Sequence, residues 1–246
     1  MKRPAFTKLI ECVPQTIALR SGVMIPVRGR MEAKHFWNMF TSEEYSSFIP
    51  YLAQLKGPEL LLVDCGAAIG MFSLFVEHVR RLELVPWQRT RYVLIEPASY
   101  NLRRLHRNIG ANIRKEDFTI LQGLAGERSG EVDFYESRLF RWGSNRFRKM
   151  SVLDRKTRRR FVDIAEHLDH RPCLLKVDIE GAEFGLLEVY REALEKVDAF
   201  TVEWHEAFGD VDPATKLLES TGLKLVKRIT PGGRKVDFYL RDGSTR

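Results

Sequence analysis

A turn of small residues flanked by acidic residues is the first feature of this sequence that could do chemistry. It reads Asp64-Cys65-Gly66-Ala67-Ala68-Ile69-Gly70 and begins at the last residue of a mostly apolar run over residues 60–64. Small residues at such a turn let a ligand approach the backbone closely, and Asp64 places a carboxylate where a phosphate would be repelled. A second carboxylate, Glu96, ends the next apolar run, where it could accept hydrogen bonds from both hydroxyls of a ribose.

Two classes of nucleotide cofactor bind at turns of this kind. A dinucleotide needs G-x-G-x-x-G, with its pyrophosphate on the helix N-terminus, but Ala68 stands between Gly66 and Gly70 here. S-adenosylmethionine carries a cationic amino group and a sulfonium and no phosphate, so the two carboxylates suit it electrostatically. The pattern therefore favours S-adenosylmethionine, with a tight turn that binds no ligand as the alternative.

Three further polar residues close later apolar runs. Asp178 ends the run 174–178, and the alternation of a strand would put Glu203 and His205 on one face of the run 199–205. A hydroxyl that receives a methyl group must lose its proton, and a histidine suits that task near neutral pH. We predict His205 as the base, Glu203 as the acid that orients or assists it, and Asp178 beside the methyl donor. A structural histidine is the alternative; the three groups could also hold a divalent ion, but no spacing requires one, and we predict no metal.

From residue 60 onward, short apolar runs alternate with stretches of helical spacing. This alternation predicts a parallel sheet with helices on both faces, whose ligands bind beyond the carboxyl ends of the strands. The chain ends in two strands joined by a Pro-Gly-Gly turn, which predicts an antiparallel hairpin at the sheet edge. The predicted strands cover 60–64, 92–96, 118–122, 174–178 and 199–205, and the predicted helices cover 72–81, 99–108 and 183–196.

Three segments resemble the signatures of the FkbM family of S-adenosylmethionine-dependent methyltransferases. They are VDCGAAIGMFSLF, LIEPASYNLRRLHRNI and LLKVDIEGAEFGLLE, and the resemblance extends to residues 40–45 and 202–205. Residues 176–183 are most similar to the family's K-x-D-x-E-G-A-E block. The resemblance implies an α/β, class I methyltransferase (Rossmann-like) fold with a mostly parallel seven-stranded sheet whose last strand is antiparallel. It also implies O-methylation of a hydroxyl on a small molecule, a sugar or a secondary metabolite.

The turn and the resemblance together give a predicted cofactor site. Ala68 stands where many relatives carry Asn, so one polar contact to the cofactor is absent from the expected set. The predicted S-adenosylmethionine-binding residues are Asp64, Gly66, Ala67, Gly70, Glu96, Pro97, Leu124, Asp178 and Tyr45.

Charge is concentrated in one segment of the chain. The net charge is +7, but Ser137 to Arg160 hold ten Lys or Arg against one acid (+9), which leaves 30 basic and 32 acidic residues (−2) elsewhere. Phe140, Trp142 and Phe147 interleave with these basic residues, a pattern that could bind RNA or another polyanion. The alternative is a solvated loop and helix start whose arginines pair with nearby acids. A methyltransferase for a polyanion and a non-catalytic cofactor-binding module therefore remain competing hypotheses.

Length and composition limit the remaining possibilities. The 246 residues are 44% hydrophobic and 30% charged, which is typical of a globular chain, and no apolar run approaches the roughly 18 residues of a membrane span. Three scattered cysteines argue for a reducing, cytoplasmic location. We predict an N-terminal segment over residues 1–59, whose aromatic residues cover the sheet edge or the pocket, and a methyltransferase domain over 60–246 with a basic insertion at 131–170. A homodimer could close the pocket.

Overall fold

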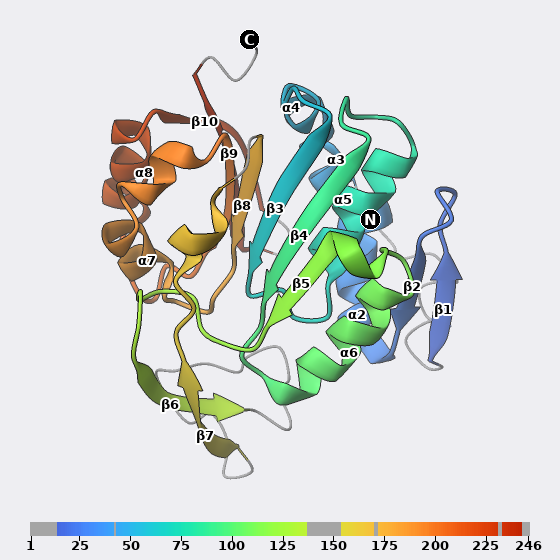
Figure 1. Ribbon diagram of the computed structural model, residues 1–246, viewed down its shortest axis with the longest axis horizontal. Coiled ribbons are helices and arrows are strands. Elements are labelled where there is room, and N and C mark those ends of the chain that lie inside the picture. Colours follow the sequence, from blue (N-terminus) through green and yellow to red (C-terminus); the bar gives the residue numbers. More distant parts are fainter. Residues whose placement is uncertain (1–13, 42, 137–153, 170–171, 231–232, 243–246) are drawn as a thin grey trace.

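A seven-stranded sheet runs through the centre of the molecule, with helices on both of its faces (Figure 1). The structure is a computed structural model that describes residues 14–41, 43–136, 154–169, 172–230 and 233–242. The strand order is β10-β11-β9-β8-β3-β4-β5. The strands are β3 (Glu59–Cys65), β4 (Arg89–Ile95), β5 (Phe118–Leu121), β8 (Cys173–Val177), β9 (Ala199–Trp204), β10 (Leu223–Ile229) and β11 (Lys235–Arg241).

The predicted parallel sheet and C-terminal hairpin are both confirmed. β3 pairs in parallel with β4 and β8, and β8 with β9, whereas β11 is antiparallel to both of its neighbours. The hairpin occupies the sheet edge as predicted, but its last strand is not the outermost one. β11 lies between β9 and β10, because its backbone also pairs with β9 along its length.

The helices divide between the two faces, and each buries apolar side chains of alternate strand positions. Along β3, Leu60 and Leu62 belong to the core under α5 (Met71–Arg81) and α6 (Ser99–Gly110). Leu61 and Val63 belong to the other core, under α7 (Glu183–Val189) and α8 (Val211–Ser220). A strand buried on both faces reads as a continuous apolar run, as residues 60–63 do.

The predicted helix over 183–196 is two elements in the structure. α7 ends at Val189, and a separate 3-10 turn, η4, covers Ala193–Lys196. The chain leaves the helical conformation at Tyr190, whose side chain is fully buried and whose hydroxyl donates to the carbonyl of Glu127.

The N-terminal segment packs on the same face of the sheet as α5 and α6. A buried ion pair between Glu32 and Arg104 joins it to α6, and Phe48 packs 5.0 Å from Phe238, ring centroid to ring centroid. Phe48 therefore packs against the sheet, while α2, the following turn and Tyr45 reach the cavity described below. The elements are β1 (Gln15–Ala18), β2 (Met24–Val27), α2 (Gly29–Phe36), η1 (Trp37–Thr41), α3 (Glu43–Ser46) and α4 (Ile49–Leu52).

The described part of the basic insertion forms a second antiparallel hairpin, β6 (Glu131–Glu136) with β7 (Arg155–Arg160). Residues 155–160 therefore form a strand, and not the helix start that the alternative interpretation of the basic segment expected. Acids on β6 pair with bases on β7: Asp133 with Lys156, Glu131 with Arg158 and Glu136 with Arg159. This cross-strand pairing stabilises the hairpin and confirms, for these three bases, the expected pairing with nearby acids. Residues 137–153, with Phe140, Trp142 and Phe147, lie outside the described residues.

Across the described ranges, no helix combines the length and the apolar character that crossing a membrane requires.

Candidate functional site

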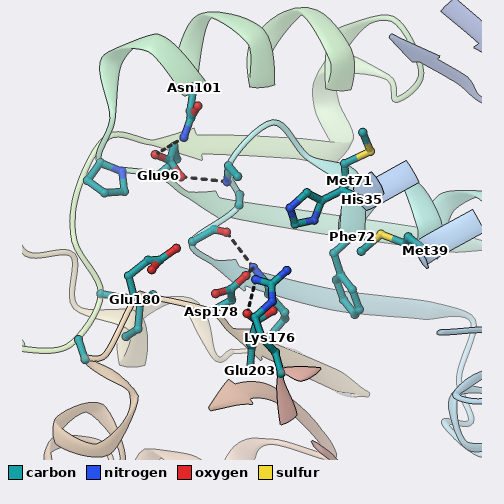
Figure 2. Close-up of a pocket in the computed structure, with 18 of the residues that line it drawn as sticks. His35, Met39, Met71, Phe72, Glu96, Asn101, Lys176, Asp178, Glu180 and Glu203 are labelled. Carbon is teal, nitrogen blue, oxygen red and sulfur yellow. Dashed lines mark hydrogen bonds and ion pairs between the residues drawn. The ribbon is translucent and has the colours of Figure 1, made fainter. Parts of the chain in front are cut away.

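A cavity of about 340 Å³ opens beyond the carboxyl ends of the strands around the point where the strand order reverses. Its wall comes from the segments that follow β3, β4, β5 and β8, from the end of β9, and from α2 and η1 of the N-terminal segment (Figure 2). This is the place where an open α/β sheet binds its ligand.

The turn after β3 forms one wall of the cavity and requires glycine at two points. Gly66 has φ +77°, and a Cβ atom there would lie 1.8 Å from the carbonyl oxygen of Asp178. Gly70 has φ +87° at the start of α5, and a Cβ atom there would meet Ile109 of α6 at 2.9 Å. The turn is therefore held against the segment after β8 on one side and against α6 on the other.

Glu96 lies beside this turn and is hydrogen-bonded to it (Figure 2). It is 4% exposed and lines the cavity. Its Oε2 accepts a hydrogen bond from the backbone N–H of Ala68 at 2.9 Å, and its Oε1 accepts from the backbone N–H of Ala98 at 2.8 Å and from Asn101 Nδ2 at 3.2 Å. Burial raises the pKa of Glu96 to about 7. The carboxylate thus links the small-residue turn to the beginning of α6 and is placed to accept hydroxyl groups.

Asp64 does not face the cavity as the sequence suggested. It is fully buried, its Oδ2 accepts a hydrogen bond from Ser73 Oγ at 2.7 Å, and its Oδ1 lies 3.0 Å from Lys176 Nζ. Lys176 lines the cavity instead and donates to the carbonyl of Gly66 at 2.8 Å. Burial lowers the pKa of Lys176, but the carboxylates of Asp64 and Asp178 raise it above its usual value, so the ammonium group keeps its charge. The charge presented to a ligand here is therefore the cation of Lys176.

Carboxylates gather at the other end of the cavity, where Asp178, Glu180 and Glu203 all belong to its wall. Arg234, from the turn before β11, pairs with Glu203 at 2.5 Å. Burial and the neighbouring Asp178 raise the pKa of Glu180 to about 8 and that of Glu203 to about 7. Glu180 has a left-handed backbone (φ +56°), a conformation that costs energy in a residue other than glycine. This end is acidic, crowded and partly strained.

His205 lies beside this cluster but is not among the residues that line the cavity. Its Nδ1 is 2.8 Å from Glu183 Oε1, and its Nε2 is 3.5 Å from Glu180 Oε2 and 3.9 Å from Glu203 Oε1. Burial lowers the pKa of His205, but the hydrogen bond to Glu183 has the larger, opposite effect, so the pKa is raised to about 9. An imidazolium has no lone pair to accept a proton, so this arrangement argues against His205 as the base. Glu203 and His205 lie on the same side, as the alternation predicted, but Glu183 and not Glu203 orients the ring, because of these two only Glu183 is within hydrogen-bond distance of it.

The structure brings most of the predicted site residues to one cavity, although the role of each stays a prediction. Asp64, Gly70 and His205 are outside its lining. The predicted residues in the lining are Tyr45, Gly66, Ala67, Glu96, Pro97, Leu124, Asp178 and Glu203.

Sequence reasoning assigned no role to several residues of the lining. Lys176 opens the K-x-D-x-E-G-A-E block, and Asn101 stands in the first turns of α6, so the sequence held a signal for both. His35 and Arg234 come from opposite ends of the chain, and only the folded structure brings them to the cavity. Burial, followed by the charge of Arg234, lowers the pKa of His35 to about 4, so that this histidine is neutral at physiological pH.

The fold and the site define a class I, S-adenosylmethionine-dependent methyltransferase. The sheet has seven strands with the last one antiparallel, a turn of small residues follows β3, and an acid follows β4. The model of the methyltransferase FkbM domain matches residues 64–224, and the chain belongs to that family. No curated protein matches the chain.

Solved structures are similar to this chain at low sequence identity. The FkbM methyltransferase from Methylobacillus flagellatus KT is 18% identical with a TM-score of 0.54, over 86% of this chain and 54% of that chain, so this chain spans about half of its length. Fibrillarin from Aeropyrum pernix, solved with natively bound S-adenosyl-L-methionine, is 10% identical with a TM-score of 0.47, over 94% and 84%. TrmK from M. capricolum, solved with S-adenosylhomocysteine, is 7% identical with a TM-score of 0.46, over 79% and 67%.

Proposed function

We propose that this chain transfers the methyl group of S-adenosylmethionine to a hydroxyl of a small molecule, such as a sugar or a secondary metabolite. The observation that carries the proposal is the two-ended cavity. One end has Glu96 and the turn at Gly66, which suit the cofactor, and the other has the carboxylates of Asp178, Glu180 and Glu203. Carboxylate oxygens accept hydrogen bonds from hydroxyl groups, so this end favours an acceptor rich in hydroxyls.

Positioning would supply most of the rate acceleration. The cofactor supplies a methyl group made electrophilic by its sulfonium, and the acceptor oxygen must approach in line with the bond that breaks. Glu96 would hold the ribose hydroxyls, and Gly66 and Lys176 the methionine part of the cofactor. Asp178, whose segment touches the turn at Gly66, would orient the acceptor hydroxyl. The proton of that hydroxyl would pass to one of the carboxylates on the cavity wall.

A screen of acceptors tests this proposal. Incubation with S-adenosylmethionine and a panel of sugars and phenols should release S-adenosylhomocysteine and yield a methyl ether with at least one hydroxyl acceptor. Asp178→Asn should lower that turnover at least about 100-fold, because the amide cannot orient or deprotonate the hydroxyl as a carboxylate does. Glu206→Gln removes a nearby carboxylate that pairs with Lys235 on the surface, and it should leave turnover unchanged. Methylation of amines alone, with no ether formed, would contradict O-methylation.

The basic hairpin supports a second candidate, an acceptor that carries phosphates. Phe134 of β6 lines the cavity, and Arg159 of β7 donates to the carbonyl of Pro97, which also lines it. The hairpin is therefore part of the cavity's surroundings, although acids pair with three of its bases.

Salt dependence separates this candidate from the first. A single-stranded RNA that makes three phosphate contacts should bind roughly 20-fold more weakly at about 200 mM than at about 50 mM salt, because binding releases counterions. Fluorescence anisotropy of a labelled RNA measures this change. Absence of RNA binding, or an affinity indifferent to salt, would reject the polyanion candidate.

A further inference from the structure

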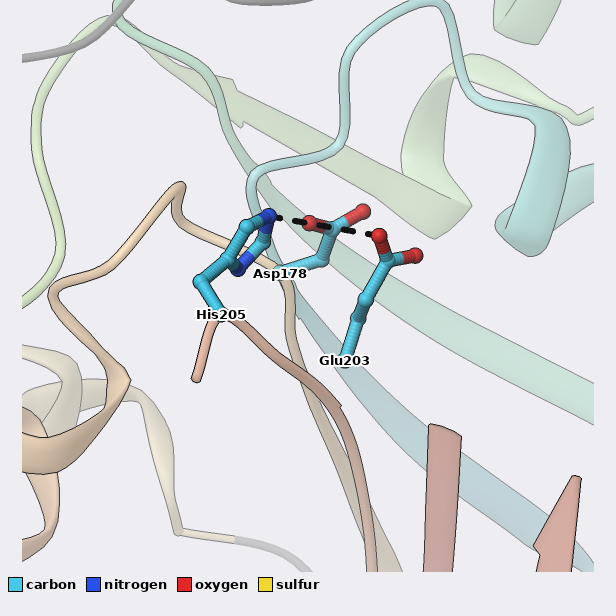
Figure 3. Close-up of side chains that lie close together, drawn as sticks. All are labelled: Asp178, Glu203 and His205. Atoms are coloured by element: carbon cyan, nitrogen blue, oxygen red, sulfur yellow. Dashed lines mark ion pairs between the residues drawn. The ribbon is translucent and has the colours of Figure 1, made fainter. Parts of the chain in front are cut away.

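Three side chains of metal-ligating types meet at the acidic end of the cavity (Figure 3). Asp178 follows β8, Glu203 lies in β9 and His205 follows it, and one ligand atom from each lies within 4.8 Å of the others. We propose that these three residues bind a divalent cation of the Mn²⁺ or Mg²⁺ type. The role of the cation rests on the proposed function, whereas its binding does not.

The donor set suits such an ion. Two carboxylates and one imidazole match cations that prefer oxygen ligands and tolerate nitrogen, and Mn²⁺ is the best fit among them. Asp178 and Glu203 project from the ends of two hydrogen-bonded parallel strands, so the rigid sheet fixes their spacing. Both also line the cavity, which leaves the remaining coordination positions open to a ligand.

The orientation of His205 is the one that metal-binding histidines have. Its Nδ1 is bonded to Glu183 Oε1, and this leaves Nε2 on the side of Glu180 and Glu203. A histidine that ligates a metal through one nitrogen usually donates the other N–H to a carboxylate, which fixes the ring. Glu183 is itself fixed, because the same oxygen accepts the backbone N–H groups of Ile179 and Gly181 at 3.0 and 3.2 Å.

A buried carboxylate oxygen adds an independent observation. Glu183 is fully buried, and its Oε2 has no hydrogen-bond partner among the described residues. A buried carboxylate hydrogen-bonded to Nδ1 makes the other ring nitrogen, Nε2, a stronger metal ligand.

Two fixed cations, Lys176 and Arg234, lie beside the proposed site. Lys176 lies 3.8 Å from Asp178 but is closer to Asp64, at 3.0 Å, and Arg234 pairs with Glu203. Asp178 is therefore the carboxylate of the proposed site with the more distant fixed cation, which leaves its oxygens available to a divalent ion.

A cation held there would act on the methyl acceptor. Because Asp178 and Glu203 face the cavity, the acceptor hydroxyl could complete the coordination of the ion, which would lower the pKa of that hydroxyl. His205 would then contribute as a ligand instead of as a base. This would explain why the ring is bonded to Glu183 and turned toward carboxylates.

Titration of the purified full chain with Mn²⁺ tests the site, since electron paramagnetic resonance measures the free ion directly. We expect one ion to bind per chain with micromolar affinity and with ¹⁴N modulation from the imidazole. Asp178→Asn should weaken binding at least about tenfold, and His205→Gln should also remove the ¹⁴N modulation. Glu206→Gln is the matched control, because it removes a carboxylate that is next to His205 in the sequence but pairs with Lys235. This variant should bind Mn²⁺ with the same affinity as the unchanged chain.

Two results would overturn the cation site. One is no binding of Mn²⁺ up to millimolar concentration, and the other is binding that neither Asp178→Asn nor His205→Gln weakens while circular dichroism shows both variants folded. Calorimetry with S-adenosylhomocysteine on the same sample keeps the two proposals distinguishable. If the chain binds S-adenosylhomocysteine but not Mn²⁺, the cation site is rejected and the proposed function stands. If it binds Mn²⁺ but not S-adenosylhomocysteine, the proposed function is rejected and the ion-binding site stands.

Discussion

Glu96→Ala should weaken the binding of S-adenosylhomocysteine at least about 100-fold. A carboxylate that accepts two ribose hydroxyls makes two charge-assisted hydrogen bonds, each worth about 1.5–3 kcal/mol, and each 1.4 kcal/mol is a factor of ten in affinity. The substitution also leaves the backbone N–H groups of Ala68 and Ala98 without their acceptor, so the turn beside the cofactor loses its support. Isothermal titration calorimetry measures the affinity.

Two further variants show whether the effect belongs to the site. Glu116→Ala removes a carboxylate whose side chain is 61% exposed and should leave the affinity unchanged. Glu96→Gln should weaken binding too, because one oxygen that accepts a backbone N–H becomes an NH₂ donor. If Glu96→Ala bound S-adenosylhomocysteine as tightly as the unchanged chain, Glu96 would have no part in holding the ribose.

The affinity should also depend on pH through Glu96. Because burial raises its pKa to about 7, the carboxyl group gains a proton as the pH falls through that value and loses an acceptor for the ribose. Between about pH 4.5 and pH 7, Glu96 keeps its proton in the folded state but has lost it in the unfolded state, where its pKa is near 4.5. The contribution of Glu96 to the free energy of unfolding therefore falls as the pH rises through this range. S-adenosylhomocysteine should therefore raise the melting temperature more at about pH 8 than at about pH 6. An equal increase at both values would contradict this role.

Gly66→Ala should lower the free energy of unfolding by about 3 kcal/mol or more. The new Cβ atom would lie 1.8 Å from the carbonyl oxygen of Asp178, and the left-handed φ of +77° disfavours any side chain. The turn after β3 and the segment after β8 would have to separate, which would also disturb the cofactor end of the cavity. Urea denaturation measures the loss of stability.

Gly185→Ala is the matched control for this substitution. Gly185 lies inside α7, a Cβ atom there would have no heavy atom within 4 Å, and alanine should stabilise the helix by about 0.5–1 kcal/mol. Equal stability of Gly66→Ala and the unchanged chain would show that the close approach of Gly66 to Asp178 does not exist.

The strands and the cavity could be predicted because their signals are local. Each parallel strand of the central sheet contains an apolar run, and parallel strands bring their carboxyl ends to one edge. The positions of Gly66, Glu96 and Asp178 at one cavity therefore followed without knowledge of side-chain packing. The place of β11 between β9 and β10 did not follow, because a hairpin signal says nothing about which of its two strands pairs with the rest of the sheet.

The contacts of particular side chains depended on register, which the sequence does not show. Asp64 faces Lys176 because β3 and β8 pair these two positions, and the cation of Lys176 thereby replaces the carboxylate expected at the cavity. His205 is held by Glu183, from the beginning of α7, and not by its neighbour in the strand. The run Arg155–Arg160 was ambiguous for another reason. Basic residues on both of its faces hide the alternation of a strand, and the acids that pair with them lie more than twenty residues earlier.

The most direct test of cofactor binding at this cavity is a calorimetric titration of the purified chain with S-adenosylhomocysteine, with NAD in a matched titration. We predict one-site, micromolar binding of S-adenosylhomocysteine and no binding of NAD, because Ala68 interrupts the dinucleotide pattern of the turn and carboxylates line the cavity. Binding of NAD without S-adenosylhomocysteine, or binding of neither, would contradict the assignment of the cavity to a methyl donor.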